Sequence, residues 1–433
     1  MTTVPAVTSG DSPNRVPRLV VRTVELTDTP CDLLDFLDNE HPTTWVRRGE
    51  GLAARGTAAR LDVGGPGRFA DADRWWRRLV RAAAVRNEVG LPGTGLMAFG
   101  SFTFADAPDA GSSSLVVPEL VLGRRSGRNW LTTITTEPAL PRVPALDELI
   151  DTTPVAEPIG VEFRHGDMTT DDYVAAVAEA VRRIGDGQLD KVVLARDLLA
   201  TAAEPFDLRA PLARLAERYP ACWSFALDGL IGATPEMLIR LENGLVTSRI
   251  LAGTIRRSDD DAHDLRLAAS LARSSKDLEE HEYAVRSVAE ALAPHCSSIN
   301  LPESPFVLHL PNVMHLATDV AGVVTDDSSA LELAGALHPS AAVCGTPTLD
   351  ALDAIASLER IGRGRYSGPV GWTDADGNGE WGIALRCAQQ DPSDSSRMRL
   401  YAGCGIVADS IPEAELAETE AKLIPVRDAL ASD

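Results

Sequence analysis

The chain has 433 residues, 44% of them hydrophobic, so it can bury a substantial core as one large domain or several ordinary ones. Its formal charge of −22, from 41 basic and 63 acidic residues, argues against nucleic acids and anionic membranes as partners. Its six cysteines lack C-x-x-C spacing, which indicates neither a zinc site nor a disulfide framework and fits a reducing cytoplasm.

The N-terminal segment, residues 1–18, is rich in threonine, proline and serine. This polar composition predicts disorder. The segment has no apolar signal core, and no later stretch of about 18 uncharged apolar residues could cross a membrane. We therefore expect a soluble protein that stays in the cytoplasm.

Residues 19–135 indicate mixed strands and helices, without a motif that carries recognisable chemistry. Residues 136–160 contain five prolines, which is typical of an irregular connection that covers a surface. This connection could be mistaken for a linker between domains. No internal repeat is evident in the remainder of the chain.

The most informative stretch is Asp190–Arg196, a β-branched apolar run that follows a turn signal and predicts a buried strand. Side chains alternate along a strand, so Lys191 shares its face with Val193 and Ala195. Removal of water from such a lysine would lower its pKa toward the range of a general base. A solvated lysine at the strand end is the alternative, and this stretch alone does not decide between them.

A second candidate, Glu236, follows Thr-Pro and precedes an apolar strand. Proline fixes the local backbone, so the glutamate is held at a defined strand entrance. An apolar environment would raise its pKa and make it a general acid, whereas a solvated edge-strand glutamate is the alternative. Farther along, Gly253 permits close backbone approach to an anion, although the same pattern fits an ordinary turn.

Two predicted helices each carry a pair of carboxylates on one face. The pairs are Asp277 with Glu280 in the first helix and Glu415 with Glu418 in the second. The second helix begins at Ser410–Glu413, which we interpret as a capping box with an early proline, and it also carries Lys422. The four carboxylates could share Mg²⁺, a hard cation that takes oxygen ligands, whereas solvated acidic faces are the alternative.

The C-terminal strands contain further candidates. Arg386 ends a predicted strand, Glu380–Arg386, where its guanidinium could bind a carboxylate. The predicted strand Tyr401–Val407 contains Gly403 and Gly405, which suit backbone contact with a ligand.

Three local signals make structural predictions. Thr170 is predicted to cap the helix before the lysine strand. Asp374–Gly379 resembles the start of a calcium loop, but its twelfth position is Leu385 and its flanks are strand-like, which predicts a hairpin tip. Pro425 lies in the predicted last helix, where it indicates a kink or an early end.

Taken in order, these segments resemble the chorismate-utilising enzymes, a family that includes isochorismate, salicylate, anthranilate and aminodeoxychorismate synthases. The matching stretches are Lys191–Arg196, Gly232–Glu236, Leu251–Arg257, Lys276–His281, Val313–Thr318, Leu337–Gly345, Arg363–Trp372, Glu380–Arg386, Ala402–Val407 and Pro412–Lys422. They lie within residues 160–425, whereas residues 1–160 match only in overall position.

The resemblance implies an α+β fold with two antiparallel sheets stacked face to face, helices around them, and a site in a cleft. It implies a single chorismate-binding domain, residues 19–433. It also implies that Mg²⁺ binds a carboxylate of chorismate. The implied metal ligands are Glu280 and Glu418, with Asp277 and Glu415 acting through water.

The resemblance also implies roles around the substrate. Lys191 would be the general base that activates water for attack at C2, and Glu236 the general acid that protonates the departing C4 hydroxyl. The enolpyruvyl carboxylate would meet Tyr366, Arg386 and the backbone of Gly403 and Gly405. Gly253, Thr254 and His315 would line the ring site, and Lys422 would lie near the metal-bound carboxylate.

The choice among family branches depends on few positions. Ammonia-using members carry glutamine at the position of Lys191, and the aminodeoxychorismate branch often has a lysine at that of Ala252, so both positions favour water as nucleophile. Salicylate synthases usually have a threonine at the position of Ala342, which favours isochorismate as the product. Ile250 and Ser340 depart from the family pattern near the site.

We therefore expect a Mg²⁺-dependent isochorismate synthase for quinone or siderophore-type salicylate or dihydroxybenzoate synthesis, monomeric and without a glutaminase partner. One alternative is a salicylate synthase, which goes on to eliminate pyruvate. Another is an inactive chorismate-binding subunit that needs a partner. Lys191 and Glu236 argue against the last alternative, because a protein that only binds chorismate needs neither.

Overall fold

The computed structural model describes residues 16–27, 32–106, 111–145, 148–149, 153–258 and 260–431. The disorder predicted for residues 1–18 falls mainly on residues 1–15, which lie outside the described part of the chain, as does Cys31.

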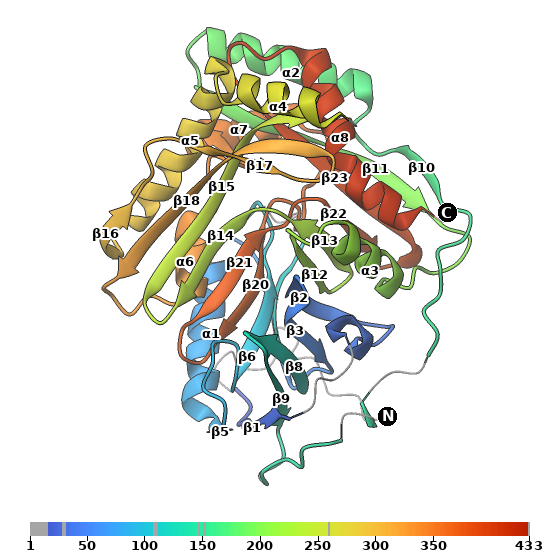
Figure 1. Ribbon diagram of the computed structural model, residues 1–433, viewed down its shortest axis with the longest axis vertical. Helices are drawn as coiled ribbons and strands as arrows, with labels where there is room; N and C mark the ends of the chain where they lie inside the picture. Colours follow the sequence, from blue (N-terminus) through green and yellow to red (C-terminus); the bar gives the residue numbers. More distant parts are fainter. Residues whose placement is uncertain are drawn as a thin grey trace.

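Two large sheets form the centre of the molecule (Figure 1). Within the described residues, sheet A has 13 strands and sheet B has 10. Sheet A contains, in spatial order, β10 (Glu162–His165), β11 (Lys191–Thr201), β23 (Asp394–Ile406), β22 (Cys387–Asp391), β13 (Leu230–Thr234), β12 (Trp223–Leu227), β2 (Thr43–Arg47), β3 (Glu50–Arg55), β8 (Leu120–Arg125), β9 (Arg128–Thr135), β1 (Val20–Leu26) and β5 (Ala84–Asn87), with β19 (Gly345–Thr346) beside β11.

Sheet B contains β16 (Cys296–Asn300), β18 (Val313–Val324), β15 (Leu245–Arg256), β14 (Met237–Glu242), β21 (Gly379–Ile383), β20 (Pro369–Asp374), β6 (Met97–Ser101), β7 (Ser113–Val117) and β4 (Ala59–Val63), with β17 (Phe306–His309) beside β18. Among the described strand pairs, only β1 with β5 is parallel. The hairpin predicted at 374–379 is confirmed, because it joins β20 to β21.

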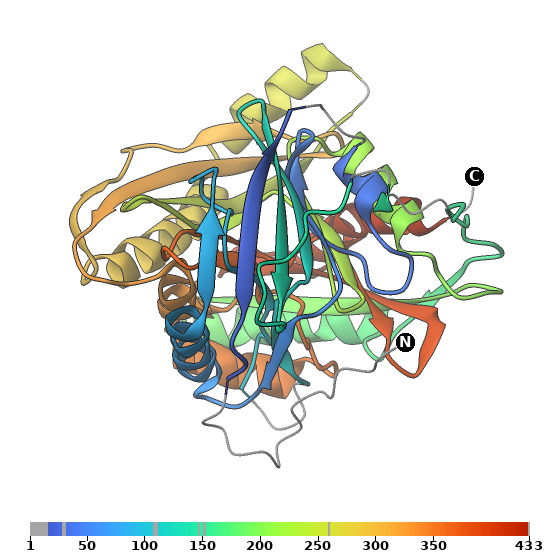
Figure 2. The same ribbon diagram turned by 90° about the horizontal axis from the view of Figure 1, so that it is seen from below.

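Helices surround the strands, as the view from below shows (Figure 2). They are α1 (Arg68–Ala82), α2 (Thr170–Gly185), α3 (Arg209–Arg218), α4 (Asp261–Leu271), α5 (Ser275–Leu292), α6 (Ala330–Leu337), α7 (Thr348–Leu358) and α8 (Pro412–Leu430), with a 3₁₀ turn at Leu33–Phe36. Helix α5 packs on β15 and β18, and α8 packs on β23. The two helices with predicted carboxylate pairs therefore lie on neighbouring sheets.

The inner faces of the two sheets pack against each other. One buried cluster combines Trp45, Trp130 and Phe225 of sheet A with Met237 and Trp372 of sheet B. Alternate apolar side chains along the strands supply this layer, as expected for sheets buried on one face. The predicted α+β fold with two stacked sheets is confirmed.

The first 160 residues supply strands to both sheets: β1, β2, β3, β5, β8 and β9 to sheet A, and β4, β6 and β7 to sheet B. The prediction that residues 19–433 form a single domain stays a prediction. Within the described part of the chain, no helix is long and apolar enough to cross a membrane.

Two predictions about the starts of helices are wrong. Helix α2 is capped by Thr169, whose hydroxyl accepts a hydrogen bond from the Asp172 N–H, and not by Thr170. The residue before α8 is Ile411, without a side-chain cap, because the Ser410 hydroxyl accepts from the Val407 N–H instead.

Of the kink or early end predicted for α8 at Pro425, the early end does not occur, because the helix continues to Leu430. Proline has no N–H to give to the carbonyl four residues earlier, which belongs to Ala421. The Asn312 side chain donates to this carbonyl at 2.9 Å. A contact distant in sequence therefore satisfies the group that Pro425 leaves free.

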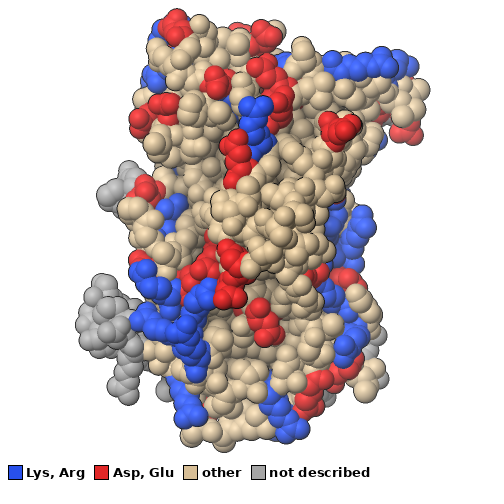
Figure 3. All heavy atoms as spheres, turned by 90° about the vertical axis from the view of Figure 1, so that its left-hand side faces the viewer, with Lys and Arg blue, Asp and Glu red and all other residues tan. Residues whose placement is uncertain are grey.

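The surface carries opposite charges side by side (Figure 3). Along α2, Arg182 lies 2.8 Å from Glu179, and along α5, Arg286 lies 2.6 Å from Glu282. Exposed pairs of this kind contribute little to stability. The exclusion of nucleic acids as partners stays a prediction.

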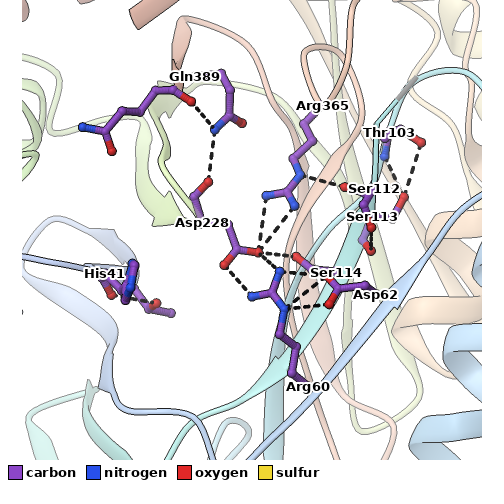
Figure 4. A network of polar contacts seen from close by, with 12 residues as sticks. His41, Arg60, Asp62, Thr103, Ser112, Ser113, Ser114, Asp228, Arg365 and Gln389 are labelled. Carbon is purple, nitrogen blue, oxygen red and sulfur yellow. Dashed lines mark hydrogen bonds and ion pairs between the residues drawn. The ribbon is translucent and has the colours of Figure 1, made fainter. Parts of the chain in front are cut away.

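A partly buried ionic cluster joins the two sheets around Asp228 (Figure 4). Asp228 lies at the tip of the β12–β13 hairpin and accepts hydrogen bonds from Arg60 at 2.7 Å, Ser114 at 2.6 Å and Arg365 at 3.4 Å. Burial alone would raise the pKa of Asp228, but the hydrogen bond from Arg60 and the two guanidinium charges hold it below its ordinary value. Because Arg365 contacts Asp228, the cluster holds the residue directly before Tyr366 in place.

We predict that Asp228→Asn lowers the free energy of unfolding by about 1–3 kcal/mol at pH 7, because Arg60 and Arg365 lose their shared carboxylate. Asp62→Asn is the control, since Asp62 contacts the same Arg60 from a half-exposed position, and we expect a cost below about 1 kcal/mol. Urea unfolding measures both. Equal effects would contradict the role of Asp228 as the centre of the cluster.

Candidate active site

The predicted site residues gather around one cavity, enclosed by strands of both sheets and by α5 and α8. Ten of the fourteen line it: Glu236, Gly253, Thr254, Glu280, His315, Tyr366, Arg386, Gly403, Gly405 and Lys422. Lys191, Asp277 and Glu418 each contact a lining residue, and Glu415 adjoins Glu418. A larger cavity of about 390 Å³, beside Trp45 and Trp223, contains none of the fourteen.

Lys191 opens β11 and is completely buried, so the alternative of a solvated lysine is wrong. Its Nζ atom lies 3.4 Å from the backbone carbonyl oxygen of Glu280 and 3.5 Å from the Oε1 atom of the same residue. Burial lowers the pKa of Lys191, and the charge of Glu280 partly opposes this shift. The amine is therefore easier to deprotonate than an ordinary lysine.

Glycine is required beside the Lys191 side chain. In the antiparallel register of β11 with β23, Val193 pairs with Gly405 and Ala195 with Gly403. A Cβ atom at Gly405 would lie 2.0 Å from the Glu280 Oε1 atom and 3.0 Å from the Lys191 Cε atom. The missing side chain therefore leaves the room in which the lysine and the glutamate meet.

Glu236 lies between β13 and β14, directly after Pro235, and only 4% of it is exposed. Burial raises the pKa of Glu236 to about 7, while a backbone hydrogen bond with Leu251 and the charge of Lys191 oppose the rise. The alternative of a solvated edge-strand glutamate is wrong. At neutral pH this carboxyl group exists in both its protonated and its ionised form.

Four carboxylates and two lysines form the acidic end of the site. Lys276 lies 2.5 Å from Glu415, and Lys422 lies 2.6 Å from Glu418. Burial raises the pKa of Asp277, Glu280 and Glu415, and the charge of Glu418 adds to each rise. Burial alone would also raise the pKa of Glu418, but Lys422 holds it below its ordinary value.

These carboxylates fit a hard divalent cation. Four carboxylates gather here beside the three lysines Lys191, Lys276 and Lys422, and oxygen atoms are the ligands that Mg²⁺ prefers. Within the described residues, the donor atoms of Glu415, Glu418 and Cys404 lie within 4.8 Å of one another. Burial raises the pKa of Cys404 well above its ordinary value, so its neutral thiol is a poor ligand for a hard cation.

Arg386 also lines the cavity and is 8% exposed. The prediction that it ends a strand is wrong, because β21 ends at Ile383 and Arg386 occupies the link to β22 with φ 49°. Within the described part of the chain, no carboxylate lies within ion-pair distance of it. A buried guanidinium of this kind is available to an anionic ligand.

Tyr366 and Gly403 lie beside this arginine in the cavity wall. The Tyr366 ring stacks on Tyr401 with 5.0 Å between the ring centroids. A Cβ atom at Gly403 would lie 3.1 Å from the Tyr366 hydroxyl, and the Gly403 carbonyl accepts a hydrogen bond from Lys422 at 2.9 Å. Gly403 of β23 therefore lies next to both Tyr366 and Lys422.

The residues predicted to line the substrate ring come from the paired strands β15 and β18, where Thr254 lies opposite His315. Gly253 has φ 75° at a shift in this register, and a Cβ atom there would lie 2.9 Å from the Asp277 Cβ atom. The Thr254 hydroxyl lies 3.1 Å from the His315 Nδ1 atom.

The sequence did not single out a buried ion pair between Glu359 and Arg363 that supports the lysine strand. Arg363 donates to the carbonyls of Val193 at 2.7 Å and Val343 at 2.8 Å, and Glu359 accepts from the Ala195 N–H at 2.7 Å. The spacing of four residues between Glu359 and Arg363 was the one sequence signal that could have indicated this ion pair. Since α7 ends at Leu358, this pair lies beyond the helix that such spacing suggests.

Comparisons with known proteins identify the family of the chain. The family model described as "Chorismate binding enzyme" matches residues 14–431. Isochorismate synthase DhbC of Bacillus subtilis is 42% identical over 275 residues, which cover 61% of this chain and 68% of that protein. Isochorismate synthase EntC of Escherichia coli is 38% identical over 252 residues, covering 57% of this chain and 64% of that protein.

Solved structures show the same architecture. The crystal structure of DhbC from Bacillus anthracis matches with a TM-score of 0.75 and 32% identity, covering 92% of this chain and 98% of that one. Anthranilate synthase component I from Streptococcus pneumoniae shares the fold, with a TM-score of 0.63 and 21% identity over 94% of this chain and 92% of that one. Enzymes of this family depend on metal ions in general. The chain belongs to the chorismate-binding enzyme family.

Proposed function

We propose that the chain is an isochorismate synthase, which adds water at C2 of chorismate and releases the hydroxyl group from C4. The observation that carries the proposal is the pairing of a buried amine with lowered pKa, Lys191, and a buried carboxyl group, Glu236, whose pKa is raised to about 7. Such opposed shifts are typical of a base and an acid that act together. The names of the relatives DhbC and EntC support the same reaction.

The two groups divide the proton transfers. The Lys191 amine takes a proton from water as the water oxygen bonds to C2, the ring double bonds shift, and the C4–oxygen bond breaks. Glu236 gives its proton to the departing hydroxyl, which leaves as water. The product is an isomer of the substrate, so no oxidant or reductant is needed.

The remaining residues bind and orient the substrate. Arg386, Tyr366 and the backbone of Gly403 and Gly405 would hold the enolpyruvyl carboxylate. Gly253, Thr254 and His315 would border the ring, with Lys422 near the ring carboxylate. Ala342, which also lines the cavity, offers no hydroxyl group there, and this favours isochorismate over salicylate as the product.

We further propose that the metal is Mg²⁺, held by Glu280 and Glu418 directly and by Asp277 and Glu415 through water. When bound, the ion would neutralise the ring carboxylate of the substrate and hold the ring in place. The carboxylate oxygens suit this hard cation better than a thiol-seeking one.

We predict that the purified chain converts chorismate to isochorismate with Mg²⁺ alone, without ammonia or a partner subunit. Chromatography identifies the product. Salicylate with pyruvate would instead show a salicylate synthase, and a folded chain without turnover would show a subunit that needs a partner.

In the same assay, Lys191→Gln should lower kcat by about 10²–10⁴-fold with little change in KM, because the base is lost while the binding groups remain. Arg164→Gln, which removes an exposed cation on the neighbouring strand β10, is the control and should behave like the wild type. Unchanged turnover in Lys191→Gln would remove the lysine from the mechanism.

We predict that Glu236→Gln stabilises the protein at pH 8.5 by about 3 kcal/mol, since burial raises the pKa from 4.5 to about 7 and one pKa unit corresponds to about 1.4 kcal/mol. The folded state binds this proton more tightly than the unfolded state, so the wild type loses stability as the pH rises from about 4.5 to 7. Glutamine removes that loss. The difference should vanish near pH 4.5.

Urea unfolding at both pH values measures this effect, with the exposed Glu303→Gln as the control that should show no difference. A Glu236→Gln variant that is less stable than the wild type at pH 8.5 would contradict the raised pKa.

Removal of divalent cations with EDTA should abolish turnover, and Mg²⁺ should restore it. We predict that Glu418→Gln weakens Mg²⁺ binding at least about tenfold in calorimetric titrations. Glu413→Gln, in the exposed first turn of the same helix, is the matched control and should bind Mg²⁺ like the wild type. Equal affinities for the two variants would place the metal elsewhere.

A further inference from the structure

A chain of polar contacts runs along the wall of the site from Arg386 to the acidic end. The Arg386 Nη2 atom lies 3.2 Å from the His315 Nε2 atom, and the His315 Nδ1 atom lies 3.1 Å from the Thr254 hydroxyl. The Thr254 side chain in turn lies close enough to Glu418 to lower the pKa of its carboxyl group. The chain therefore connects the two ends at which anionic groups would be held.

The donors in this chain can point in only one direction. A guanidinium group has no acceptor, so Arg386 must donate and the His315 Nε2 atom must accept. A neutral imidazole then carries its hydrogen on Nδ1, which donates to the Thr254 hydroxyl. The single hydrogen of that hydroxyl is left for Glu418, whose carboxylate can only accept.

The surroundings favour the neutral ring. Only 4% of His315 is exposed. Burial and the charges of Arg386 and Lys422 lower the pKa of His315 well below its ordinary value, although a backbone hydrogen bond with Gly253 opposes the shift. The imidazolium form, which could not accept from Arg386, is therefore disfavoured.

The Thr254 backbone also faces the acidic end, where it lowers the pKa of Asp277. The register of β15 with β18 shifts between Ala252 and Thr254, directly beside this contact. One residue therefore contacts two of the four carboxylates of the acidic end.

We propose that His315 and Thr254 are positioning residues that form a one-directional hydrogen-bond relay between Arg386 and Glu418. The relay orients the guanidinium for one carboxylate of the substrate and the glutamate for the metal that holds the other. It rests on the proposed function for the identity of these two ligands.

The tautomer of His315 tests the relay in the metal-free protein without substrate. In ¹⁵N spectra of histidine-labelled protein, His315 should show a protonated Nδ1 and an unprotonated Nε2. His338 is an internal control, because its Nε2 atom donates to the Phe104 carbonyl at 2.9 Å and should show the opposite tautomer. His315→Gln and His338→Gln assign the two signals. A protonated Nε2 atom in His315 would overturn the proposal.

A pair of Thr254 variants tests the metal end by calorimetric titration with MgCl₂ in the absence of chorismate. Thr254→Val keeps the shape of the side chain but removes the hydroxyl, and it should weaken Mg²⁺ binding about 10–100-fold. Thr254→Ser restores the hydroxyl and should bind within about threefold of the wild type. Unchanged binding by the valine variant, or no recovery by the serine variant, would overturn the relay.

These readouts separate the relay from the proposed function. Isochorismate formation with the wrong His315 tautomer would reject the relay and leave the function intact. The correct tautomer and the valine–serine difference without chorismate turnover would support the relay and reject the function.

Discussion

The enclosure of the Lys191 amine is the constraint on which the rest of the site depends. A charge removed from water is costly unless a partner compensates for it, and here Glu280 lies 3.5 Å away. Glycine at position 405 provides the space for both groups. The chain contains only three lysines, Lys191, Lys276 and Lys422, and each of them contacts a carboxylate of the candidate site.

The site separates lysines that stay charged from the one that can lose its proton. The carboxylates beside Lys276 and Lys422 outweigh the effect of burial and raise their pKa values, so both remain cations. For Lys191, burial outweighs Glu280 and lowers the pKa. Glu236 shifts in the direction opposite to Lys191 for the same reason, because a low-dielectric environment disfavours the charged form of either group.

The sequence predicts those parts of the structure that depend on local pattern. The strand at Lys191, the entrance at Glu236 and the carboxylate pairs on two helices are all present. Local pattern does not show the distant contact by which Asn312 satisfies the carbonyl group that Pro425 leaves free in α8. It also does not show that Arg386 has φ 49° and lies in a link where the sequence predicts a strand. The sequence predicts Thr170 instead of Thr169 as the cap of α2 because the two adjacent threonines have the same capping chemistry.

The most direct test of the central claim is the pKa of Lys191 itself, measured by titration of the ¹³Cε signals in lysine-labelled protein. Because the chain has only three lysines, the signals of Lys276 and Lys422 in the same spectrum serve as references for Lys191. The account predicts that Lys191 loses its proton at a lower pH than both Lys276 and Lys422. A Lys191 signal that titrates together with the other two, or above them, would contradict it.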